Sequence, residues 1–267
     1  RYGAMILMLL TLVFSSEVLA KTHTTTASQK SHLTKASNKQ VSSKQEYSRN
    51  SAKSSSLPDL RKYPSGTPRK KAFLRTVMPY ITSQNAAITA ERNWLISKQY
   101  QGQWSPAERA RLKDIAKRYK VKWSGNTRKI PWNTLLERVD IIPTSMVATM
   151  AAAESGWGTS KLARNNNNLF GMKCMKGRCT NAPGKVKGYS QFSSVKESVS
   201  AYVTNLNTHP AYSSFRKSRA QLRKADQEVT ATAMIHKLKG YSTKGKSYNN
   251  YLFAMYQDNQ RLIAAHM

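Results

Sequence analysis

The 267-residue sequence is poor in acidic residues, because 13 Asp and Glu face 44 Lys and Arg, for a formal net charge of +31. A field of this strength predicts an anionic partner, which could be nucleic acid, a membrane surface or an envelope polymer. Histidine is scarce too, with five scattered residues. Clustered metal ligands are therefore not indicated, and neither a metal nor a cofactor is expected.

Only two cysteines are present, Cys174 and Cys179, in the segment CMKGRC. In an oxidising compartment the pair could close a small disulfide loop. A zinc site would need more ligands than the sequence offers nearby, and two free thiols are the remaining alternative. The disulfide is the favoured interpretation.

Long apolar runs are missing except at the N-terminus. There an apolar stretch covers residues 4–14 after Arg1, and Val18 and Ala20 put small residues before a cleavage site. The run is short for a transmembrane span, so it predicts a signal peptide (1–20) cleaved after Ala20. We therefore expect a periplasmic or secreted protein at the cell envelope. Such a protein rarely meets nucleic acid, so its expected partners are anionic cell-envelope polymers.

Large apolar residues are also few in residues 21–70, where Ser, Thr, Lys and Gln dominate. Such a segment buries too little surface to offset its ordering entropy, which predicts a disordered basic linker. It has 11 basic and 2 acidic residues, a net +9, and residues 71–267 have 32 and 10, a further +22. The part expected to fold is therefore basic in its own right.

Residues 71–267 have apolar residues mainly at helical spacing, which predicts a fold of the α+β class that is predominantly α. Ser105, Pro106 and Glu108 have the order of a capping box at a helix start. Gly, Pro and Lys with short alternating apolar positions predict a hairpin or loop lobe over 172–192. The expected helices cover residues 73–99, 105–119, 131–140, 143–154, 195–208, 215–224, 228–238 and 247–264.

The segment AAAESGWG, residues 151–158, ends an apolar run on a carboxylate. Met146, Met150 and Glu154 share a helix face, which places the acid beside buried side chains. Partial desolvation raises the pKa of a carboxyl group and suits it to general acid catalysis. The alternative is an ordinary helix end with a glycine stop at Gly156, and spacing alone favours neither.

A second polar segment, NNNNLFGMK, covers residues 165–173. Asparagine side chains can hydrogen-bond amides or hydroxyl groups, and asparagine tolerates unusual backbone angles. Taken alone, a solvated asparagine-rich loop is the simpler interpretation.

The two segments follow each other in the stretch AAAESGWGTSKLARNNNNLFGMK. This stretch resembles the bacterial peptidoglycan N-acetylglucosaminidase family, which carries E-S-x-x-G followed by N-N-L-F-G. The segments GYSQFSSVKESVSAYVTNLNTHPAY (188–212) and GYSTKGKSYNNYL (240–252) continue the resemblance, and PTSMVATMAAAESGWG is most similar to the Bax proteins. The resemblance covers residues 71–267. It implies a lysozyme-like domain with a small β-lobe and an N-terminal helical extension.

The activity implied by this resemblance is that of an exported hydrolase, a β-N-acetylglucosaminidase that cleaves β-1,4 bonds in the glycan strands of peptidoglycan. Glu154 matches the catalytic general acid, and Tyr241 matches a tyrosine near the reaction centre. Tyr189 is a further candidate for sugar contact because it is an aromatic residue of the expected β-lobe. The other residues that match the substrate cleft are Trp157, Asn168, Leu169, Phe170, Gly171 and Tyr248.

A second acid is missing from the expected β-lobe, since residues 172–192 contain neither Asp nor Glu. A two-carboxylate hydrolase needs that group to activate water or to act as nucleophile. The next acid, Glu197, is explained by a capping box with Ser194. Two mechanisms remain: the 2-acetamido group of the substrate acts as nucleophile, or Glu154 serves as acid and then base in a lytic transglycosylase. A non-catalytic cell-wall-binding module is the third alternative.

Overall fold

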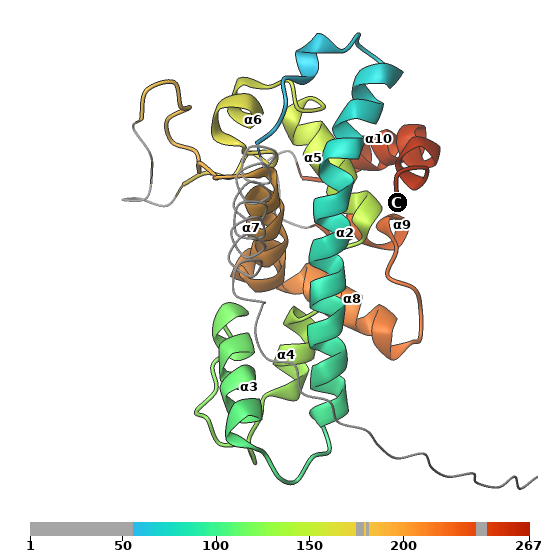
Figure 1. Cartoon of the computed structure of the whole chain (residues 1–267). Coiled ribbons are helices and arrows are strands. Elements are labelled where there is room, and N and C mark those ends of the chain that lie inside the picture. The colour runs from blue at the N-terminus through green and yellow to red at the C-terminus, as the bar shows by residue number, and fades with distance from the viewer. Residues whose placement is uncertain (1–55, 175–178, 180–181, 239–244) are drawn as a thin grey trace, which may run out of the picture. The chain divides into compact units, whose positions relative to one another are not determined.

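The computed structural model describes residues 56–174, 179, 182–238 and 245–267 (Figure 1). The chain divides into two units, residues 1–50 and 51–267, and all of the described residues belong to the second. The predicted signal peptide and most of the predicted linker lie outside the described residues. No helix in the described ranges is both long and apolar enough to cross a bilayer.

The described unit is mainly helical, as the sequence predicts. The small β-lobe of the predicted α+β class is not confirmed, because the described residues contain no strand and a single isolated antiparallel bridge, Lys173↔Tyr189. The elements of the first half are η1 (Leu60–Lys62), α2 (Thr67–Lys98), α3 (Pro106–Arg118), α4 (Trp132–Arg138), α5 (Thr144–Ser155) and α6 (Lys161–Asn166). Those of the second half are α7 (Val195–Thr208), η2 (Pro210–Tyr212), α8 (Ser213–Lys224), α9 (Ala231–Met234), η3 (Ile235–Lys237) and α10 (Lys246–Ala264).

Helix α5 lies in the core. Eight of its 12 residues are buried, which agrees with a segment that is apolar on every face. The long helix α2, with 32 residues, contacts both α5 and α7, and α10 contacts α5 (Figure 1). The end of α5 is therefore fixed against α10, which follows it by about a hundred residues in the sequence.

Local capping explains where α3 and α7 begin. Ser105 accepts a hydrogen bond from the N–H of Glu108, and the Glu108 carboxylate accepts one from the N–H of Ser105, so the predicted capping box is present. At α7, Ser194 accepts from the N–H of Glu197. The Glu197 carboxylate accepts from the N–H and hydroxyl of Ser193 rather than from Ser194. Glu197 therefore serves the helix start as expected, with its return bond shifted by one residue.

The expected end of the linker, between residues 70 and 71, lies inside α2. Leu57 and Leu60 are buried, with 8% and 1% of their surface exposed. They pack against the backbone of Gly158, where an added Cβ would lie 2.6 Å from Leu60 Cδ1 and 3.1 Å from Phe73 Cδ2. Two leucines in a polar segment look solvated by composition, because Gly158, on which they pack, is about a hundred residues further along the chain. The folded unit therefore starts before residue 70.

A buried charge cluster joins α2, α4 and α8. Asp140 is 1% exposed, and its carboxylate lies 3.0 Å from Arg223, 3.6 Å from Arg92 and 3.7 Å from Arg219. Arg219 also donates to the carbonyls of Glu137 and Ile141, at 2.8 Å each. Burial lowers the pKa of the Arg219 guanidinium to about 10, and the Asp140 carboxylate opposes that shift. These groups hold the end of α4 against its neighbours.

Candidate active site

Glu154 lies in the last turn of α5 and is half-buried. The helix ends at Ser155, and Gly156 follows in the left-handed conformation with φ 57°, which glycine adopts without a steric cost. A carboxylate near a helix C-terminus is disfavoured by the helix dipole. Helix stability therefore gives no reason for an acid at this position.

Tyr248 of α10 donates its hydroxyl hydrogen to Oε1 of Glu154. The two residues are 94 positions apart, and the contact between α5 and α10 brings them together. Both side chains are half-buried, so they form a polar pair at the edge of the core. Tyr248 is expected from the sequence to contact substrate, and the structure places its hydroxyl on the acid itself.

The second carboxylate oxygen of Glu154 faces Gly171. A Cβ built at Gly171 would lie 3.4 Å from Oε2, so the absence of a side chain leaves room beside that oxygen. Gly171 has φ +64°, which also favours glycine. No described residue donates a hydrogen bond to Oε2, whereas Oε1 holds the Tyr248 hydroxyl. Oε2 is therefore the oxygen that can meet a substrate.

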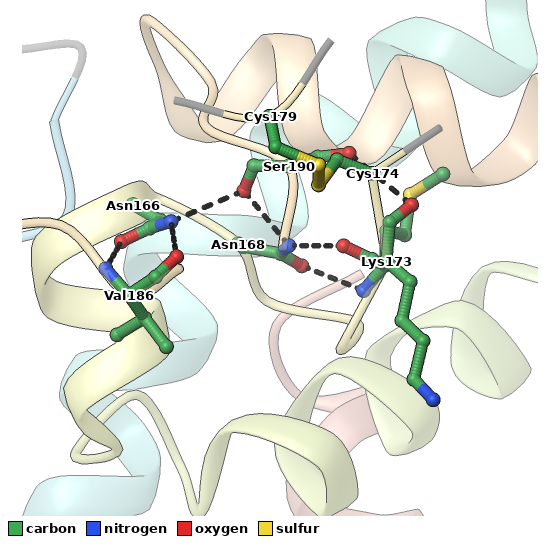
Figure 2. The surroundings of a disulfide bond; sticks show 8 residues. Asn166, Asn168, Lys173, Cys174, Cys179, Val186 and Ser190 are labelled. Atoms are coloured by element: carbon green, nitrogen blue, oxygen red, sulfur yellow. Dashed lines mark hydrogen bonds between the residues drawn. A yellow bond between two sulfur atoms is a disulfide. The ribbon is translucent and has the colours of Figure 1, made fainter. Parts of the chain in front are cut away.

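Asparagine side chains fix the loop that follows α6 (Figure 2). Asn168 is 1% exposed; its amide donates to the carbonyls of Met172 (2.9 Å) and Ser190 (3.0 Å) and accepts from the N–H of Met172 (3.0 Å). Asn166 binds the carbonyl and the N–H of Val186 at 3.1 and 2.9 Å. Amide groups therefore satisfy backbone polar groups that strand pairing would otherwise satisfy.

The other two asparagines of the run also bind backbone. Asn165 donates to the carbonyl of Gly184 at 2.6 Å. Asn167 donates to the carbonyl of Phe192 and accepts from the N–H of Leu57, at 3.1 Å each. The solvated loop inferred from NNNN alone is therefore wrong. The buried amide of Asn168 has a structural role in this loop, and the contact with substrate that the resemblance implies stays a prediction.

The disulfide expected between Cys174 and Cys179 is present, with a Cα–Cα distance of 5.3 Å (Figure 2). It stands beside the isolated bridge, where the N–H of Cys174 donates to the carbonyl of Gly188 at 3.2 Å. Tyr189 of that bridge is half-buried, and its contact with a sugar stays a prediction. The loop is therefore tied together at its base by a covalent bond and by the asparagines.

The two aromatic residues of the expected cleft occupy different surroundings. Phe170 is 3% exposed and stacks on Tyr202 with ring centroids 3.9 Å apart, so it packs in the core instead of lining a cleft. Trp157 is half-buried; its ring meets Phe73 edge-on at 5.6 Å, and Lys70 Nζ lies 5.1 Å from its centroid. Helix α2 therefore holds Trp157, and its expected contact with a sugar stays a prediction.

Glu154 is the acid of the site as far as the structure describes it. In the sequence Glu154 is the only acidic residue between Asp140 and Glu197; Asp140 is surrounded by arginines, and Glu197 is bound at the start of α7. No three His, Cys, Asp or Glu side chains gather as a metal site within the described part of the chain. Tyr241, the other predicted catalytic residue, lies outside the described residues.

A cavity of about 240 Å³ lies elsewhere, among residues of α2, α3 and α7. Its one acid, Glu91, is bound by Arg118 at 2.6 Å and by the Tyr119 hydroxyl at 3.3 Å. Burial raises the pKa of Tyr119 above its usual range. This cavity therefore contains no acid with a free oxygen, in contrast to Glu154.

Residues 131–261 match the family model described as mannosyl-glycoprotein endo-beta-N-acetylglucosaminidase. The matched range contains Glu154, Gly171 and Tyr248, the three residues that the structure brings together. It excludes α2 and α3, although Phe73 and Lys70 of α2 hold Trp157 beside that group. No solved structure matches the chain.

Proposed function

Over residues 131–261 the chain belongs to the glucosaminidase family, and from this premise we propose that the protein hydrolyses β-1,4 glycosidic bonds in the glycan strands of peptidoglycan, as a β-N-acetylglucosaminidase. The observation that supports the assignment is the carboxylate of Glu154. One of its oxygens is held by the Tyr248 hydroxyl, and the other faces the space left by Gly171.

In this proposal Glu154 is the general acid. Oε2 gives its proton to the glycosidic oxygen while the bond from that oxygen to the anomeric carbon breaks, so the departing sugar leaves as a neutral alcohol. Tyr248 holds Oε1 and fixes the direction in which Oε2 points. The half-burial of the pair limits the water around the proton before transfer.

The positive charge that develops on the sugar must then be quenched without a second protein carboxylate. The 2-acetamido group of the substrate can attack the anomeric carbon as an internal nucleophile, and water then opens the resulting ring. Glu154, ionised after the first step, takes a proton from that water. The absence of any other acid between Asp140 and Glu197 favours this substrate-assisted route over a two-carboxylate mechanism.

The same single acid supports a second candidate, a lytic transglycosylase. In that reaction the ionised Glu154 takes a proton from a hydroxyl group of the same sugar, whose oxygen then closes on the anomeric carbon to give an anhydro end. Both candidates require export, and we propose that the protein works at the cell envelope because residues 1–20 have the pattern of a signal peptide.

Mass spectrometry of the soluble products of purified peptidoglycan tests the proposal, with Glu154→Gln as the matched inactive control. A new reducing end on N-acetylglucosamine supports it. A reducing end on muramic acid would place the cut at the other bond, and an anhydro end would identify a transglycosylase. Wild-type protein that binds peptidoglycan but releases nothing would contradict catalysis and leave a wall-binding module.

A further inference from the structure

The tryptophans of this chain are concentrated in one segment. Four of the five, at positions 94, 104, 123 and 132, lie within 39 residues, and the fifth, Trp157, is held by α2 beside the candidate active site. The segment covers the end of α2, all of α3 and the start of α4, and all but its last two residues precede the family match. The family match around Glu154 therefore does not account for most of these residues.

Three of the four indole rings are in contact with one another. Trp94 at the end of α2 meets Trp104 edge-on, with centroids 6.4 Å apart, and Trp104 meets Trp132 of α4 at 6.3 Å. Arg111 of α3 lies over the Trp94 ring, 4.3 Å from its centroid. We call Trp94, Trp104, Trp132 and Arg111 the tryptophan surface.

The rings of the tryptophan surface are half-buried, and each packs in part against the hydrophobic core. None of the three indole N–H groups donates a hydrogen bond to another described residue, and none is among the buried polar atoms without a partner. An indole N–H that finds no partner in the protein and is not buried faces solvent. Each ring therefore keeps its N–H toward solvent, and because each is only half-buried, part of its apolar surface also stays exposed. Apolar ring surface and a donor together can bind a sugar ring and its hydroxyl or acetamido oxygens.

The segment around the rings is also strongly basic. Residues 101–130 contain nine Lys and Arg and two acids, a net +7. Both acids are already bound, because Glu108 meets Lys98 at 2.6 Å and Asp114 meets Arg118 at 2.7 Å. Tyr100, which follows α2, is 97% exposed. Aromatic faces and unneutralised cations together suit a glycan that carries carboxylates.

The tryptophan surface lies far from Glu154. Figure 1 shows α5 beside the first half of α2, and the last turns of α2 are joined to α3 by the Lys98–Glu108 pair and to α4 by Arg92. Phe73 of α2 meets Trp157 near the candidate active site, and Trp94 lies 21 residues further along the same helix. At 1.5 Å per residue this separates the two places by about 30 Å.

We propose that the tryptophan surface is a second glycan-binding site, which holds a carboxylate-bearing peptidoglycan strand about 30 Å from the bond that Glu154 cleaves. The proposal rests on the proposed function, since it takes the same strand as ligand. Attachment at a second point raises the effective concentration of polymer at the active site. It gives short fragments no such advantage, because they reach only one of the two sites.

Pelleting with purified insoluble peptidoglycan tests the proposal, with every variant made in a Glu154→Gln background so that the ligand stays intact. We expect Trp104→Leu, which removes the central ring but keeps a smaller apolar side chain, to weaken binding about tenfold. Trp123→Phe is the matched control. Its indole N–H is bound to the carbonyl of Asn126 at 2.9 Å, so we expect unchanged binding.

A second measurement separates binding from damage to the fold. With Glu154 intact, Trp104→Leu should digest insoluble peptidoglycan more slowly than wild type and cleave short soluble fragments at the wild-type rate. Slower cleavage of both substrates, with a lowered unfolding temperature, would reduce the role of Trp104 to packing and overturn the proposal. Arg111→Gln, which leaves the rings in place, should weaken binding most at low salt.

The outcomes separate this proposal from the proposed function. Equal pelleting of Trp104→Leu and its parent would overturn the tryptophan surface while digestion by the wild type continues to support catalysis. Binding that vanishes with salt but is insensitive to Trp104→Leu would show attraction by charge alone, and it would also overturn the proposal. Wild-type protein that neither binds nor digests peptidoglycan would contradict both.

Discussion

Asp140 lies just before α5 and Glu154 lies in its last turn, and the fold surrounds the two carboxylates in opposite ways. Asp140 is 1% exposed, and three arginines lie within 3.7 Å of its oxygens. Its Oδ1 also accepts from the N–H of Ile141. Glu154 is half-buried, has one neutral donor in Tyr248, and keeps Oε2 without a donor from the described residues.

The difference shows which carboxylate belongs to the structure and which is available for chemistry. A buried carboxylate costs free energy unless cations and donors satisfy it, and Asp140 is satisfied on both oxygens. No position remains there for a substrate. Glu154 has an oxygen left over, and Gly171 supplies the space in front of it. The two sites differ because Glu154 keeps a carboxylate oxygen without a donor from the described residues, and not merely because Asp140 is more deeply buried.

The largest expected effect is the loss of turnover in Glu154→Gln. The amide keeps the size and the Tyr248 contact but cannot transfer a proton, so turnover on peptidoglycan should fall about 10³-fold. The unfolding temperature should stay within about 2 °C of wild type, because Tyr248 is the one described residue that hydrogen-bonds Glu154. Product release and thermal unfolding measure the two quantities. A large loss of stability would show that Glu154 is structural, like Asp140.

Asp140→Asn should give the reverse pattern. Removal of its negative charge leaves the guanidinium groups of Arg92 and Arg219 buried without a counter-charge, which should lower the free energy of unfolding by about 3 kcal/mol. Urea unfolding measures that value. Turnover per folded molecule at low temperature should match wild type. A stable variant with reduced turnover would contradict the structural role assigned to the cluster.

Tyr248→Phe should have an intermediate effect on turnover. It removes the hydroxyl that holds Glu154 Oε1 and leaves the ring, so kcat should fall about tenfold, as for loss of one hydrogen bond to a charged group. KM and the unfolding temperature should change little, which distinguishes orientation of the acid from substrate binding or packing. An increase in KM at unchanged kcat would instead support the direct substrate contact that the resemblance implies.

The helices are the part of the fold that the sequence predicts well, because their start signals are local. Ser105 with Glu108 and Ser194 with Glu197 bring both partners of a cap within three residues. Glu154 is identified from its segment for the same reason, since its helix end and the asparagine run follow each other closely. Residues that lie a few positions apart in the sequence therefore predict where helices start and which short motifs are present.

Contacts between distant segments are what the sequence does not predict. The bond between Glu154 and Tyr248 spans 94 residues, and that between Leu57 and Asn167 spans 110. The asparagine run reads as solvated because its backbone partners, such as Val186, lie in a loop without strand periodicity. Arg219 counts as surface charge by composition, yet it is fully buried. Periodicity gives no signal for any of these contacts.

Glu108 provides the smallest effect and completes the comparison, because it is half-buried like Glu154 but has a cationic partner. Its ammonium partner Lys98, and after it the N–H of Ser105, hold the pKa of the Glu108 carboxyl at about 2, below its usual 4.5. A depressed carboxyl pKa contributes stability that is present above pH 4.5 and is lost as the pH falls toward 2. Glu108→Gln should therefore lower the unfolding temperature at pH 6, by less than about 2 °C since solvent still reaches both partners of the pair. Thermal unfolding of both proteins between pH 6 and 3 should show the difference shrinking as the acid is titrated. A difference that is large and independent of pH would mean that Glu108 stabilises the fold through packing. The cationic partner of Glu108 would then not explain its contribution to stability, whereas the arginines around Asp140 explain the contribution of Asp140.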